Sequence, residues 1–82
     1  MKTIKTRAWV VEDVDGSVWL FWNGREPIKD PIEKEWVSNG SNNISMVDRN
    51  ELPDGVDPKW EDDRAIEVMT TTTTVISKLE II

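Results

Sequence analysis

The chain has no cysteine and no histidine among its 82 residues. It therefore lacks disulfide bonds, thiolate nucleophiles, imidazole bases and the usual protein ligands of zinc. Carboxylates, lysines and hydroxyls remain for chemistry, but tuning their pKa values needs a buried pocket that a chain this short seldom builds beside its core. We predict that the protein is not an enzyme and has no catalytic residue, cofactor or metal site.

Long apolar segments are also missing. The longest apolar run, residues 18–22, has five residues, whereas a membrane helix needs roughly 20. Behind the basic residues near the N-terminus, the apolar stretch 8–11 has four residues, and the core of a secretory signal needs about 7 to 15. These lengths predict a cytoplasmic protein with no membrane partner.

Basic residues are few, because ten lysines and arginines stand against sixteen acids and give a net charge of -6. Direct binding of nucleic acid is disfavoured by this charge. Residues 48–63 hold seven of the acids and only two bases. Such a strip could bind a basic partner surface or imitate nucleic-acid phosphates, whereas the alternative is a solvated loop that maintains solubility. The candidate contact residues in it are Asp54, Asp57, Glu61, Asp62 and Asp63.

Two strands and a tight turn are expected in the first quarter of the chain. Residues 3–11 and 18–22 have the composition of strands, and the Asp-Gly step within 13–17 predicts a hairpin between them rather than a calcium loop. The second strand is apolar on both faces, which predicts a central position. If one face carries Val18, Leu20 and Trp22, then Trp19 and Phe21 lie on the other, where an uncovered aromatic pair would form a partner-binding patch.

The middle of the chain has strong turn signals and weak strand signals. Residues 25–35 hold two prolines and predict an edge strand or an irregular loop. Residues 35–38 and 44–47 predict a second hairpin across the polar segment 38–43. Asp48 can cap a single helical turn through Glu51, so we expect at most one helical turn over 48–52.

The C-terminal stretch, residues 66–82, predicts one long or bent strand. It contains five consecutive threonines, 70–74, which favour extended backbone. As an exposed edge, this strand could add to another sheet or to a second copy of the chain; the alternative is that it is paired within the fold.

Five tryptophans form the most unusual part of the composition. A small domain needs large apolar side chains for its core, so most of the five are expected to pack inside. The alternative is a groove that binds a peptide or a sugar through exposed indoles.

Several landmarks lie within residues 8–69: Trp9, Asp13, Asp15-Gly16-Ser17, Trp19-Leu20-Phe21, Pro27, Trp36, Leu52-Pro53 and Lys59-Trp60-Glu61-Asp62. This pattern resembles a family of short uncharacterised proteins encoded by bacterial phages and integrated mobile elements. The resemblance implies a genomic context but no activity, cofactor or site residue. After residue 69 the chain departs from the family pattern.

Together these patterns predict an all-β fold over residues 1–82, a single small domain. We expect an antiparallel meander or partly open barrel of about four to six strands with at most one short helical turn. The predicted function is a non-enzymatic accessory or interaction domain that contacts a partner protein, or its own copy, through a sheet edge or an aromatic patch. The alternative is an acidic inhibitor that mimics nucleic acid.

Overall fold

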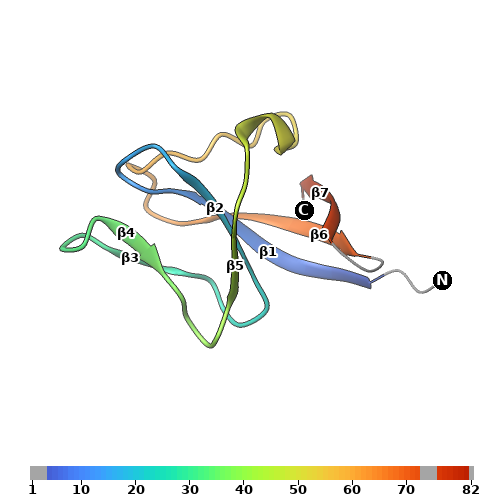
Figure 1. Cartoon of the computed structure of the whole chain (residues 1–82), viewed down its shortest axis with the longest axis horizontal. Coiled ribbons are helices and arrows are strands. Elements are labelled where there is room, and N and C mark those ends of the chain that lie inside the picture. Colours follow the sequence, from blue (N-terminus) through green and yellow to red (C-terminus); the bar gives the residue numbers. More distant parts are fainter. Residues whose placement is uncertain (1–3, 73–75, 82) are drawn as a thin grey trace.

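A computed structural model describes residues 4–72 and 76–81 and shows antiparallel strands throughout (Figure 1). The main sheet has five strands in the order β5-β2-β1-β6-β7, and a separate two-stranded sheet joins β3 and β4. The predicted all-β class with one short helical turn is confirmed. The elements are β1 (Ile4–Glu12), β2 (Val18–Trp22), β3 (Ile28–Asp30), β4 (Glu35–Val37), β5 (Asn43–Met46), the 3-10 turn η1 (Arg49–Glu51), β6 (Ile66–Thr72) and β7 (Ile76–Ile81).

The predicted hairpin of β1 and β2 lies at the centre of the main sheet. Its register pairs Val10 with Leu20 and Trp9 with Phe21. The turn is closed by the Gly16 amide, which donates to the Asp13 carbonyl at 2.9 Å, and by the Asp13 amide, which donates to the Ser17 carbonyl. β2 is interior, between β1 and β5.

The main sheet buries side chains on both faces, as the sequence of β2 predicts. On one face Val10, Leu20 and Val68 form a core with Val56, whose segment follows η1. The capped turn expected over 48–52 is confirmed, because η1 has both hydrogen bonds of a capping box between Asp48 and Glu51. The segment 47–58 thereby covers this face.

The opposite face is covered by the β3–β4 hairpin, where the sequence predicted an edge or a loop. Asp30 begins its turn and accepts the amides of Ile32 and Glu33 at 2.9 and 3.1 Å. Lys34 completes the turn with a φ of 59°. The side chain of Asp30 thus offers the backbone a local partner and reverses the chain after Pro31.

The second hairpin predicted for residues 35–38 and 44–47 is wrong. β4 pairs with β3, and β5 pairs instead with β2. The polar segment 38–43 that separates β4 from β5 bonds to the chain just after β2: the Arg25 amide donates to the Asn39 carbonyl at 2.8 Å, and the Asn42 side-chain amide donates to the Arg25 carbonyl at 2.9 Å. These bonds hold β5 beside β2.

The single C-terminal strand predicted for 66–82 is also wrong, because this stretch forms the two antiparallel strands β6 and β7. β6 pairs with β1 on its other side, so Thr70 is interior rather than at an edge, and its hydroxyl donates to the Thr6 carbonyl at 3.0 Å. β7 is the edge strand here. Thr73 and Thr74, the rest of the threonine run, lie outside the described residues.

Candidate functional site: an acidic-rimmed aromatic groove

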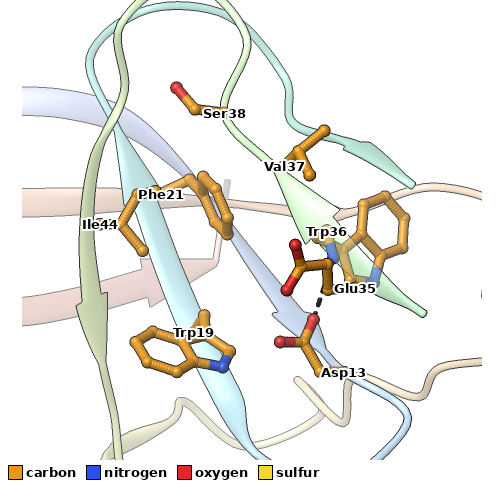
Figure 2. A pocket seen from close by; sticks show the side chains of 8 residues that line it. All are labelled: Asp13, Trp19, Phe21, Glu35, Trp36, Val37, Ser38 and Ile44. Carbon is orange, nitrogen blue, oxygen red and sulfur yellow. Dashed lines mark hydrogen bonds between the residues drawn. The ribbon is translucent and has the colours of Figure 1, made fainter. Parts of the chain in front are cut away.

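A groove of about 360 Å³ lies between the β3–β4 hairpin and the β2–β5 part of the main sheet (Figure 2). We call it the Trp19 groove. Its apolar wall comes from β2 and β5, and β4 with the β1–β2 turn supplies the opposite wall. The side chains that define it are Asp13, Trp19, Phe21, Glu35, Trp36 and Ile44.

Trp36 fixes the β4 wall of the groove. Its indole is buried against Val11 and Phe21. Its backbone amide donates to Asp13 Oδ1 at 3.0 Å, and its indole Nε1 donates to the Glu12 carbonyl at 3.1 Å. Asp13, just after β1, therefore orients the backbone of Trp36, and Glu12 at the end of β1 orients its ring.

Lys29, on β3 of the same hairpin, links Trp36 to Trp60. Its ammonium lies 5.3 Å from the centre of the Trp36 ring and 4.5 Å from that of Trp60, and it donates to the Trp60 carbonyl. A cation over two indole faces is stabilised by both ring quadrupoles. Trp36 and Trp60 are thus structural, which agrees with the expectation that most tryptophans pack inside.

The predicted aromatic pair on β2 is only half correct. Trp19 and Phe21 do lie on the face opposite Val18 and Leu20. Phe21, however, is 2% exposed because it packs under Trp36, so it forms the floor of the groove rather than an uncovered patch. Trp19 remains half-buried, with its indole Nε1 donating to the Ser17 hydroxyl at 2.9 Å.

The apolar surface continues from Trp19 onto β5, which the sequence analysis did not identify as a contact region. Ile44 is 47% exposed and Met46 is 62% exposed. They pair directly with Phe21 and Trp19 and so share their face of the sheet. In the sequence, the alternation of Ile44 and Met46 with polar neighbours could have indicated an apolar strand face. It indicates a contact surface next to Trp19 only when β5 is known to lie beside β2.

The Asp13 carboxyl is the perturbed acid of the groove. Burial raises its pKa above the ordinary value, and the nearby Asp15 charge acts in the same direction. Hydrogen bonding with the Trp36 amide and with the Trp19 side chain opposes both effects. Neither Asp13 nor Glu35 forms an ion pair within residues 4–72 and 76–81. The folded structure therefore disfavours the ionised form of the Asp13 carboxyl.

We expect Asp13→Asn to raise the free energy of unfolding near neutral pH. Asparagine keeps the oxygen that accepts the Trp36 amide but carries no charge to desolvate. A carboxyl whose pKa is raised on folding binds its proton more tightly in the folded state, so the parent protein gains stability as the pH falls through that pKa. The advantage of the asparagine variant over the parent should shrink in acid, as measured by urea unfolding at a series of pH values. A loss of stability near neutral pH would contradict the prediction.

The acidic strip of residues 48–63 is partly used inside the fold. Asp57 pairs with Arg49 at 3.0 Å and lies 3.9 Å from Lys59, and Asp62 accepts the Lys59 backbone amide at 3.0 Å. Asp48 and Glu51 form the capping box of η1. Four of the seven acids therefore have structural partners, which is the pattern of a folded loop.

Three acids of the strip are left over for a partner. Asp54, Glu61 and Asp63 are exposed, and none has a hydrogen bond or ion pair from its side chain in the described part of the chain. The structure does not bring them to the Trp19 groove, which has a separate lining. Their role as partner contacts remains a prediction.

Within residues 4–72 and 76–81, no group of three or more acidic side chains is arranged to hold a metal ion. The helical part of the same residues is the single turn η1, and no helix is long and apolar enough to cross a membrane.

In comparisons with known proteins, no family model, no curated protein and no solved structure matches the chain. The resemblance to phage-encoded proteins therefore remains a prediction.

Proposed function

We propose that the protein is a non-enzymatic interaction domain of the cytoplasm that binds an extended segment of a partner protein as an added strand beside β5. The observation that carries the proposal is the outer edge of β5, where backbone groups and apolar side chains are presented together. Strand addition to a sheet edge is a common mode of peptide recognition, in which main-chain hydrogen bonds give affinity and side-chain pockets give specificity.

The orientation of the β5 backbone follows from its register with β2. The Val47 amide donates to the Val18 carbonyl at 3.0 Å, which makes these two residues a hydrogen-bonded pair. Directly opposed residues of antiparallel strands alternate between bonded and non-bonded pairs. Ile44 and Met46 then occupy the non-bonded positions, so their N–H and C=O groups point away from β2.

These outward-pointing N–H and C=O groups have almost no hydrogen-bond partners in the described part of the chain. Within residues 4–72 and 76–81, neither the Ile44 nor the Met46 amide has a partner, and the Met46 carbonyl has only a 3.5 Å contact with the Ser45 hydroxyl. An extended segment could form four main-chain hydrogen bonds with these two residues. Its side chains opposite Ile44 and Met46 would face the Trp19 groove.

The test compares Met46→Pro with Met46→Ala. Both variants remove the methionine side chain, but proline also removes the outward N–H, which β2 does not use. Peptides would be selected from a displayed library of random ten-residue sequences on the parent protein. We expect the best peptide to lose about tenfold or more in affinity for the proline variant, and only a few-fold for the alanine variant, as measured by calorimetry.

Amide hydrogen exchange identifies the binding mode. Bound peptide should slow exchange at the Ile44 and Met46 amides, while the amides that already bond to β2 change little. Failure to enrich any peptide, or equal binding by both variants, would overturn the proposal. The other possible occupant of this edge is a second copy of the chain, which sedimentation of the free protein at increasing concentration tests. A dimer that is lost in Met46→Pro would show that a second copy covers the edge.

A further inference from the structure

We propose, resting on the proposed function, that the bound segment carries a lysine or arginine whose stem crosses Ile44 along the Trp19 indole and whose charged head is bound by Asp13 and Glu35. The inference concerns the chemistry of the partner rather than the existence of the edge site. It rests on the charge, the apolar lining and the geometry of the Trp19 groove.

The charge of the groove has one sign. Its charged lining residues are Asp13 and Glu35, and no basic side chain contributes to the wall. The two carboxylates form no ion pair within the described ranges. In the view of Figure 2 both carboxylates lie between the Trp19 indole and the Trp36 ring. A cation at this place would find two acceptors of opposite charge in a partly desolvated setting.

The burial of Asp13 supports the same conclusion. Its pKa is raised by desolvation, so the folded protein maintains a carboxylate at a place where its charge is disfavoured. The hydrogen bond with the Trp36 amide needs only an oxygen acceptor, which asparagine would supply. A bound ammonium or guanidinium would offset the desolvation cost of the ionised carboxyl, because an opposite charge within a few ångströms stabilises the ionised form.

The aromatic lining suits the stem of a long basic side chain. Lysine and arginine bury their methylene groups on apolar surface while the head reaches polar partners. An added strand would lie about 10 Å from β2, two strand spacings away. Ile44 is the β5 residue of the groove lining, and the carboxylates belong to β4 and the β1–β2 turn, so the proposal requires a long side chain from the added strand. An indole also attracts a cation over its face.

Long-range charge favours a basic partner over a second copy of this chain. The net charge is -6, so two copies repel each other. A second hollow, next to β1, has a lining that includes Lys5, Arg7 and Arg25 together with the acid Glu26. A basic segment is attracted by the net charge of the whole chain, and the Trp19 groove offers it two carboxylates with no basic side chain in the lining.

The experiment uses the peptides selected on the parent protein and a double-mutant cycle. The protein variant is Asp13→Asn with Glu35→Gln, and the matched control is Asp54→Asn with Glu61→Gln, which removes the same charge outside the groove. Each is titrated with the best peptide and with a version in which its lysine or arginine is replaced by methionine. We expect the affinity of the groove variant for the basic peptide to be at least about tenfold lower than that of the parent protein. For the methionine peptide, the affinities of the groove variant and the parent protein should agree within about twofold.

The outcomes separate the inference from the proposed function. Peptides that need the Met46 amide but show no excess of lysine or arginine would overturn the inference and leave strand addition standing. Equal losses for the basic and methionine peptides would also overturn it. A loss in the Asp54 and Glu61 control as large as in the groove variant would instead favour the acidic strip as the binding surface, as an inhibitor that mimics nucleic acid requires. If the selection enriches no peptide, both proposals are overturned.

Discussion

Replacement of Trp36 by alanine is expected to lower the free energy of unfolding by about 3 to 5 kcal/mol. Trp36 is 6% exposed and packs against Val11 and Phe21, so its truncation leaves a large cavity over the second face of the sheet. The variant also loses the indole hydrogen bond to the Glu12 carbonyl and one of the two rings that face Lys29. A chain of this length has a total stability of roughly 4 to 12 kcal/mol. Trp36→Ala should therefore remove a large share of it.

Urea unfolding followed by circular dichroism measures this loss. The matched control is Ile32→Ala in the turn of the same hairpin, where the side chain is 86% exposed and should contribute less than about 0.5 kcal/mol. If global stability falls by less than about 1 kcal/mol, the β3–β4 hairpin would be shown to unfold separately from the main sheet. Amide exchange at residues 28–37 would then speed up while the main sheet stays protected.

Local signals in the sequence predicted the local structure. The Asp-Gly step before Ser17 indicated the turn between β1 and β2, because aspartate and glycine tolerate the backbone that this turn needs. Asp48 indicated η1 because its side chain can cap a helical turn, and the structure adds the reciprocal bond from the Asp48 amide to the Glu51 side chain. Both features depend on contacts between residues a few positions apart, which is why a single sequence is sufficient to find them.

The pairing of strands that lie far apart in the sequence could not be predicted, for a physical reason. Thr70 and its neighbours favour extended backbone in any sheet, and nothing in that preference says that β6 pairs with β1 or that the chain reverses before β7. Likewise, β4 and β5 looked like partners because a polar segment joins them, yet hydrogen bonds from Asn39 and Asn42 tie that segment to the chain after β2. Side-chain to backbone bonds at such distances in the sequence have no local pattern.

The candidate site was predictable only in part. The alternation in β2 correctly placed Trp19 and Phe21 on one face, but the burial of Phe21 depends on Trp36, which arrives from a hairpin that the sequence did not indicate. Asp13 was recognised as a turn residue and not as a groove acid. Its second role follows from the position of β4, because the Trp36 amide holds the carboxylate at the wall.

The second large effect is expected for Gly24→Ala, which should cost about 2 to 5 kcal/mol of stability. Gly24 has a φ of 64°, and a Cβ built on it would lie 2.6 Å from the Gly40 carbonyl oxygen and 2.9 Å from that of Asn39. Both neighbours are backbone atoms, so the segment 38–43 has to move as a whole. That movement strains the bond from the Arg25 amide to the Asn39 carbonyl and displaces β5, which follows directly.

Gly16→Ala is the control that isolates the close approach. Gly16 also has a positive φ, 89°, but a Cβ there would meet nothing within 4 Å. Alanine at this position should cost only the conformational penalty, about 1 to 2 kcal/mol. Urea unfolding of the two variants measures the difference. Equal losses would mean that the 38–43 segment yields freely, and β5 would then be too loosely held to present a fixed edge to a partner. A larger loss for Gly24→Ala, with reduced peptide affinity in the folded fraction, would instead show that this close backbone contact keeps the β5 edge in place.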